Sequence, residues 1–104
     1  MSKTKIFLSH PMTGLTDEEV MAYRDKALNH IRKEIPDAEL LDTYYCDNVP
    51  EGAECFWFLG ESIKDIQHAD AIYLAHNWEG SHGCRVEEFI FREYGKSYKL
   101  LPEL

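Results

Sequence analysis

The sequence is poor in basic residues and contains no long apolar run, and both shortages exclude classes of protein. Lys and Arg together number 11 against 19 Asp and Glu, which gives a formal net charge of −8. Nucleic-acid-binding proteins normally present a basic face, so we expect no nucleic-acid partner. No apolar stretch approaches the roughly 20 residues of a membrane span, and the first ten residues lack the apolar core of a signal peptide. We therefore expect a cytoplasmic protein without a membrane partner.

Cysteine is also scarce. Cys46, Cys55 and Cys84 are odd in number and show no C-x-x-C spacing, which argues against a disulfide framework or a zinc ribbon and favours reduced thiols. His76 and His82 lie close to Cys84, but these residues lack the paired spacing of a zinc site. We expect neither a metal nor a cofactor.

Short apolar runs alternate with helical patterns along the chain. Strands are predicted at residues 5–9, 38–42, 70–75 and 97–101, and helices at residues 17–34, 55–68 and 84–95. Thr16 and Glu19 have the spacing of a capping box, and Gly95 is typical of a helix end. This alternation predicts one α/β domain over residues 1–104. Its fold should be three-layered and flavodoxin-like or Rossmann-like, with a four-stranded parallel sheet in the order 2-1-3-4.

Two loops of this fold lie where ligands usually bind. In doubly wound sheets the ligand crevice lies beyond the carboxyl ends of the strands, where the strand order reverses. "SHPMTG" (9–14) follows the first strand, and "HNWEGSHG" (76–83) follows the third. Glu87 comes about one turn into the next helix, whose positive end should favour its ionised form. A positioned carboxylate can attack an electrophilic sugar carbon. Spacing alone also allows Glu87 and Glu88 to be ordinary surface acids.

Three stretches, "FLSHPMTG", "IQHADAIYL" and "WEGSHGCRVEEFIFREYG", resemble the nucleoside 2-deoxyribosyltransferase superfamily, in particular its short DUF4406 branch. The resemblance implies that Glu87 is the glycosyl nucleophile and that Asp70 helps to hold the sugar or the leaving base. The residues expected to bind substrate are Ser9, Pro11, Met12, Thr13, Gly14, Trp78, Ser81, His82 and Gly83.

Ser81 bears on the kind of substrate. Superfamily members that use free nucleosides resemble this chain but have aspartate here, whereas its nucleoside 5'-monophosphate N-hydrolases have serine. Serine can donate a hydrogen bond to phosphate and an ionised aspartate would repel it, so Ser81 favours a nucleotide. The same serine is also an ordinary helix cap. The first loop lacks the arginine of the known nucleotide hydrolases, and Arg24 or Arg85 either reaches the site or is a solvated surface charge.

These features predict cleavage or transfer of the N-glycosidic bond of a nucleoside or a (deoxy)nucleoside 5'-monophosphate. Two alternatives stay open. One is a non-catalytic nucleotide-binding or sensing module, and the other is an NAD-cleaving enzyme of the TIR-like type, which would need room for a dinucleotide.

Aromatic residues suggest both stacking and self-association. Tyr44 and Tyr45 lie in a loop where a base could stack, whereas Phe56 is expected in the core. Trp57 and Phe58 lie off the apolar stripe that begins at Phe56, so one helix cannot bury all three against the sheet. We expect a second copy to cover them, and the resemblance likewise implies a homodimer or a higher homo-oligomer.

Overall fold

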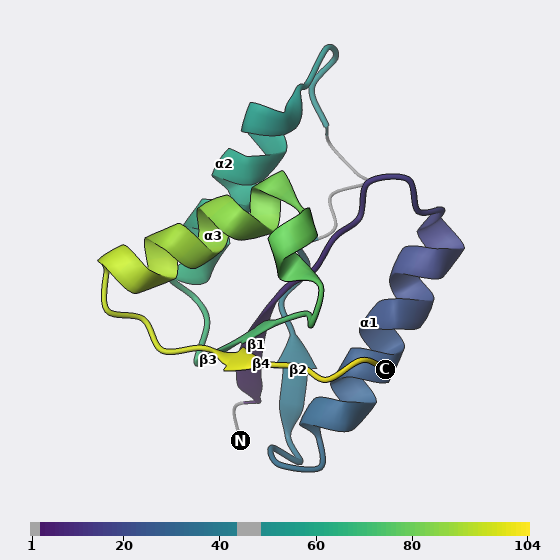
Figure 1. Ribbon diagram of the computed structural model, residues 1–104, viewed down its shortest axis with the longest axis vertical. Coiled ribbons are helices and arrows are strands. Elements are labelled where there is room, and N and C mark those ends of the chain that lie inside the picture. Colours follow the sequence, from purple (N-terminus) through teal and green to yellow (C-terminus); the bar gives the residue numbers. More distant parts are fainter. Residues whose placement is uncertain (1–2, 44–48) are drawn as a thin grey trace.

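The computed structural model describes residues 3–43 and 49–104, and these form a four-stranded, all-parallel sheet in the order β2-β1-β3-β4 (Figure 1). The strands are β1 (Thr4–Ser9), β2 (Ala38–Leu40), β3 (Ala71–Leu74) and β4 (Lys99–Leu100). The helices are α1 (Asp17–Ile31), α2 (Cys55–Ile66), α3 (His82–Glu93) and the short 3-10 helix η1 (Trp78–Gly80). The predicted fold class and strand order are confirmed. Tyr44, Tyr45 and Cys46 lie outside the described residues.

The parallel strands place the loops that follow them at one edge of the sheet. β1 is central and pairs with β2 from Thr4↔Ala38 onward and with β3 up to Ser9↔Leu74. Since all the strands run in one direction, the segments that follow β1, β2 and β3 leave the same edge of the sheet (Figure 1). This is the edge at which the sequence predicts the ligand crevice.

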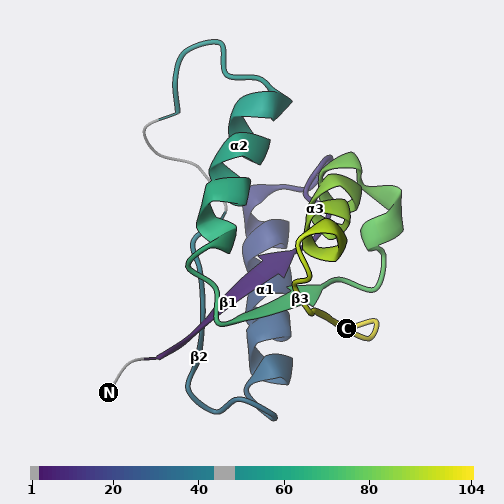
Figure 2. The ribbon, with the colours of Figure 1, turned by 90° about the vertical axis from the view of Figure 1, so that its left-hand side faces the viewer.

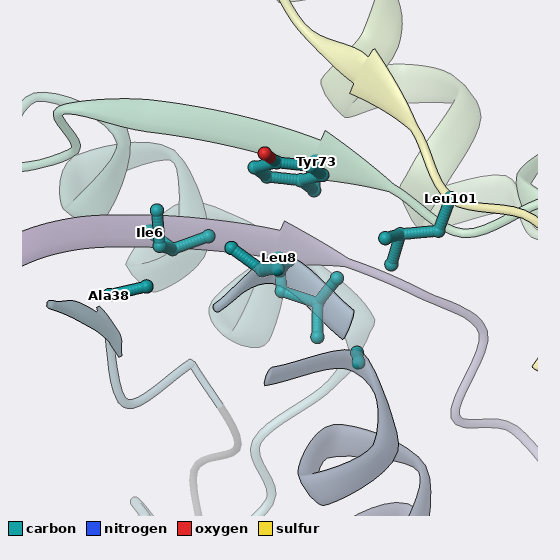
Figure 3. Packing of buried hydrophobic residues seen from close by; sticks show 7 residues of the cluster. Ile6, Leu8, Ala38, Tyr73 and Leu101 are labelled. Carbon is teal, nitrogen blue, oxygen red and sulfur yellow. The ribbon is translucent and has the colours of Figure 1, made fainter. Parts of the chain in front are cut away.

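One face of the sheet is covered by α1. Ile6 and Leu8 of β1 lie beside Tyr73 of β3 (Figure 3), and the three pack in one buried cluster with Ala27 and Ile31 of α1. Buried Ile and Leu alternate with Phe7, which points to the other face because successive strand residues face opposite sides. The near-continuous apolar run of β1 follows from burial on both faces.

The opposite face is covered by α3 and by one end of α2 (Figure 2). Phe7 meets Phe91 of α3 edge to face, with ring centroids 5.9 Å apart, and Ile66 of α2 joins the same cluster. Ile66 is the residue of α2 that is buried in the described structure. Phe56 is 77% exposed, so the expectation that it belongs to the core is wrong. α2 contacts the sheet at its carboxyl end, which leaves Phe56 and Phe58 exposed, whereas Trp57 is half-buried against Phe58.

Helix boundaries follow the capping signals more closely than the apolar spacing. The capping box is confirmed: Glu19 N–H donates to Thr16 Oγ1 at 3.1 Å, and Thr16 N–H donates to Glu19 Oε1 at 3.0 Å. α1 ends at Ile31 rather than at residue 34, because the chain tightens there into a turn. Gly95, with φ +67°, follows the end of α3 as predicted. In the described residues no helix has both the length and the apolar character needed to cross a membrane.

Candidate functional site

A pocket of about 730 Å³ opens at the carboxyl edge of the sheet, within the size range of small-molecule sites. Most of the predicted site residues line it: Ser9, Pro11, Met12, Thr13, Ser81, His82, Gly83 and Glu87. Its walls come from the end of β1, from the segments after β1 and β2, from α2 between Cys55 and Ser62, and from the start of α3. Sequence reasoning missed several lining residues, of which the polar ones are His10, Thr43, Ser62, Cys55 and Cys84.

Glu87 is a buried carboxylate in the wall of this pocket. Its side chain is among the buried polar groups at 7% exposure, and Ser9 Oγ donates a hydrogen bond to Glu87 Oε1 at 2.7 Å. Burial raises the pKa of Glu87 to about 7, while the hydroxyls of Ser9 and Ser62 act in the opposite direction. The expectation that the helix end would favour the ionised form is therefore wrong in direction. Glu87 is the sixth residue of α3, beyond the turn whose free N–H groups carry the positive end.

The adjacent Glu88 has a different environment. Tyr98 Oη donates to Glu88 Oε2 at 2.7 Å, and Arg92 forms an ion pair with Glu88 Oε1 at 3.1 Å. The pKa of Glu88 is lowered, first by the hydrogen bond from Arg92 and then by the one from Tyr98. Glu88 fastens α3 to the segment before β4 and is absent from the pocket lining.

Three of the predicted site residues lie outside the pocket lining. Asp70 precedes β3, and its Oδ2 accepts from the Lys5 backbone N–H at 2.8 Å, at the amino edge of the sheet. Parallel strands place that edge opposite Ser9, so the structure does not bring Asp70 to Glu87. Gly14 adopts φ +82° in the turn before α1, and Trp78 packs against the apolar cluster under α3.

Ser81 has two roles in the geometry of the site. Its hydroxyl accepts from the Cys84 backbone N–H at 3.4 Å, so the helix-cap interpretation is confirmed, and the residue also lines the pocket. This cap starts α3 at His82, two residues before the predicted boundary. Arg85 donates to His82 Nδ1 at 2.7 Å and to Glu79 O at 2.9 Å. Because a guanidinium has no acceptor, His82 Nδ1 accepts and its ring proton is on Nε2.

A second polar cluster lies behind the loop that follows β1. Arg24 is 6% exposed and donates to Leu41 O at 2.8 Å, to Thr43 Oγ1 at 3.3 Å and to His10 Nε2 at 3.4 Å. The interpretation of Arg24 as a solvated surface charge is therefore wrong. Burial, followed by the charge of Arg24, lowers the pKa of His10 to about 4. His10 is neutral at physiological pH, with Nδ1–H donating to Pro11 O at 3.1 Å.

The sequence contained one indication that Arg24 belongs to a buried polar cluster. Arg24 occupies a buried position of α1 together with Val20, Ala27 and Ile31, so an arginine stands within the apolar stripe. A buried charge requires several hydrogen-bond partners, which indicates an inward-facing polar site. Its partners could not be chosen from the sequence, because they come from the ends of β1 and β2.

Residues 4–99 match a protein family that is described as a domain of unknown function (DUF4406). The chain belongs to the DUF4406 family. No curated protein matches it. The match covers β1, the whole pocket and all of α3, so the site described above belongs to the DUF4406 domain itself.

Thiols of the DUF4406 domain border this site. Cys84 is buried and Cys55 is exposed, and both are free and line the pocket. Burial raises the pKa of Cys84, which makes its thiol a poor nucleophile. Within the described ranges no group of three or more His, Cys, Asp or Glu side chains is placed to hold a metal ion. Among the described residues that line the pocket, Glu87 is the carboxylic acid.

Proposed function

We propose that this DUF4406 domain cleaves or transfers the N-glycosidic bond of a nucleoside or a (deoxy)nucleoside 5'-monophosphate, with Glu87 as the nucleophile. The observation that carries the proposal is a buried carboxylate, held by Ser9 Oγ at 2.7 Å, in the wall of a pocket of about 730 Å³. The three sequence stretches that resemble the nucleoside 2-deoxyribosyltransferase superfamily contain both Ser9 and Glu87, which supports the same assignment.

The reaction would proceed in two steps. The ionised carboxylate of Glu87 attacks C1' of the sugar through an oxocarbenium-like transition state, and the bond from C1' to the base nitrogen breaks with its electron pair leaving on the base. Water or a second base then attacks C1', the bond from C1' to Glu87 breaks with its electron pair returning to the carboxylate, and the proton lost by the attacking group balances the one taken up by the departed base. With a pKa of about 7, Glu87 has both its ionised and its protonated form available near neutral pH. The hydroxyls of Ser9 and Ser62 stabilise that ionised form.

The start of α3 is the proposed position of the 5' group of the substrate. Ser81, His82 and Gly83 line the pocket there, and Arg85 donates a hydrogen bond to His82 Nδ1 at 2.7 Å. Within the described residues no Lys or Arg lines the pocket directly, so a 5'-phosphate would depend on hydroxyl, imidazole and backbone donors. These donors suit a 5'-hydroxyl as well, and the two substrate classes are separated by experiment.

Base release from a panel of nucleosides, nucleoside 5'-monophosphates and NAD tests the proposal by chromatography. We expect the wild type to release base from a nucleoside or monophosphate, Glu87→Gln to lose at least a hundredfold in kcat/KM, and Glu88→Gln to retain activity. Glu88→Gln is the matched control because it removes a neighbouring carboxylate that is absent from the pocket lining. If ligands bind but no base is released, the domain is a nucleotide-binding module. Release from NAD alone would favour the TIR-like reaction.

We also propose that the domain self-associates through α2. Phe56, Phe58 and Ile63 are exposed along a helix that has one buried residue in the described structure. The same helix contributes Phe58, Leu59 and Ser62 to the pocket wall, so a second copy that covers α2 would also fix this wall.

A further inference from the structure

Thr43 is a buried pocket residue whose hydroxyl oxygen already accepts a hydrogen bond from Arg24. It is 5% exposed, lies three residues beyond the end of β2 and lines the pocket. Arg24 donates to Thr43 Oγ1 at 3.3 Å, and the guanidinium is itself held by Leu41 O at 2.8 Å and His10 Nε2 at 3.4 Å. One lone pair of the Thr43 hydroxyl is therefore occupied by a fixed cationic donor.

The hydrogen of the Thr43 hydroxyl has no acceptor among the described residues. A buried donor without an acceptor destabilises a protein, and such donors normally meet a water or a ligand. A ligand acceptor in the pocket would complete the hydrogen bonding of Thr43. The positive charge of Arg24 behind the hydroxyl favours a partial negative charge in front of it, so a carbonyl oxygen suits this position and an amino group does not.

Apart from Ser9, which bonds to Glu87, and the exposed Thr13, the other pocket residues near the ends of β1 and β2 offer little competing polarity. Both ring nitrogens of His10 are occupied, Nδ1 by Pro11 O and Nε2 by Arg24, so His10 presents carbon atoms to the pocket. Met12, Phe58 and Leu59 add apolar surface to the same pocket. A flat, largely apolar ring that carries an acceptor fits this combination.

Strand order places Thr43 on the side of Glu87 away from Ser81. The order β2-β1-β3 puts Ser9, which holds Glu87, between the segment with Thr43 and the segment with Ser81. A substrate with C1' at Glu87 and its 5' group at Ser81 would therefore extend its base toward Thr43.

We propose that Thr43, oriented by Arg24, recognises a carbonyl oxygen of the base, so that the domain prefers keto bases over their amino counterparts. The inference rests on the proposed function for the placement of the base. Hypoxanthine is the keto counterpart of adenine, and uracil is that of cytosine, so each pair differs in the group that Thr43 would contact.

The test measures binding, so that it does not depend on turnover. In the Glu87→Gln protein, calorimetry compares 2'-deoxyinosine with 2'-deoxyadenosine and 2'-deoxyuridine with 2'-deoxycytidine. We expect the keto member of at least one pair to bind about three- to tenfold more tightly, as one hydrogen bond provides. Adding Thr43→Val should abolish the preference, and adding Thr43→Ser should retain it because serine keeps the hydroxyl. Thr4→Val is the matched control, since Thr4 Oγ1 bonds to Asp37 at the amino end of β1.

Equal affinity within both pairs, a preference for amino bases, no binding of any of the four nucleosides, or a keto preference that survives Thr43→Val would each overturn the inference. Circular dichroism establishes that the variants are folded, and Thr43→Ala replaces Thr43→Val if valine prevents folding. The two proposals fail differently. A wild type that shows the keto preference and releases no base would contradict the glycosidic reaction and leave the role of Thr43 intact.

Discussion

The burial of Glu87 that suits the residue for the proposed reaction also lowers the stability of the fold when its carboxyl group ionises. The folded protein buries its carboxyl group, and this burial raises the pKa of Glu87 from 4.5 to about 7 although Ser9 and Ser62 donate hydrogen bonds to it. A group with a raised acid pKa stabilises the fold while it is protonated, and that contribution is lost as pH rises through the folded-state pKa. A buried carboxyl group with a strongly raised pKa is more typical of functional sites than of structural ones.

Replacing Glu87 by Gln should stabilise the protein above neutral pH. Glutamine keeps the shape and can accept from Ser9, but it never ionises. At pH 8 we expect the free energy of unfolding of Glu87→Gln to exceed that of the wild type by on the order of 3 kcal/mol. This difference should disappear near pH 4, where the wild-type side chain is protonated in both states. Urea unfolding at pH 4, 6 and 8 measures this. A difference that is independent of pH would show that Glu87 does not carry the raised pKa.

The rate of base release should follow the ionisation of Glu87. If the carboxylate is the nucleophile, kcat/KM rises with pH through an apparent pKa near 7. Ser9→Ala removes a donor that favours the ionised form, so its profile should move to higher pH, while Cys84 beside Ser9 stays in its thiol form over this range. A rate that falls as pH rises through 7 would instead make Glu87 a proton donor.

At the scale of the elements, the amino end of α3 joins folding to binding. Ser81 caps the helix by accepting from Cys84 N–H, and the same residue lines the pocket beside His82. A cap of this kind contributes about 1 kcal/mol to stability. A substitution at Ser81 therefore changes two properties, and a pair of variants is needed to separate them.

Ser81→Ala and Ser81→Asp provide that pair. Alanine cannot cap, so Ser81→Ala should lose about 1 kcal/mol of unfolding free energy, whereas aspartate is as good a cap as serine and should preserve it. Aspartate sets a negative charge against a 5'-phosphate, so Ser81→Asp should lose monophosphate use at least tenfold while nucleoside use survives. Thermal unfolding and kcat/KM for a matched nucleoside and monophosphate check both expectations. Unchanged monophosphate use in Ser81→Asp would place the 5' group elsewhere.

At the scale of the whole molecule, α2 has fewer buried residues than α1 or α3 in the described structure. Phe56 is 77% exposed, and Phe58 and Ile63 are also exposed on this helix, whereas α1 is buried along Val20, Ala27 and Ile31. Exposed apolar side chains that gather on one helix often mark a surface that binds a partner. Because α2 also forms one wall of the pocket, its coverage and the completeness of the site are linked.

Phe56→Ser should weaken self-association. The substitution removes the most exposed phenylalanine without disturbing the core, so the folded monomer should persist. We expect the wild type to sediment as a dimer or larger at micromolar concentration and Phe56→Ser to shift toward the monomer. Leu104→Ser, at an exposed site on the carboxyl-terminal segment, is the control. A wild type that is monomeric over the whole concentration range would contradict the proposal.

Local features of the sequence determined the elements and their order. Apolar runs, the Thr16–Glu19 capping box and Gly95 identified the helices and strands, because such signals act over a few residues. The alternation of β and α units then predicted a parallel sheet with right-handed crossovers, and the structure confirms the parallel sheet. The clustering of "SHPMTG" with the start of α3 followed from that topology.

Burial and long-range partners were decided by the tertiary structure. Phe56 shows the spacing of a core residue and is exposed, because α2 meets the sheet at its other end. Asp70 lies at the far edge of the sheet, and Ser62 and Thr43 reach the pocket from elements distant in sequence. The raised pKa of Glu87 and the inward position of Arg24 depend on the surrounding packing, since desolvation is a property of the environment that the fold creates.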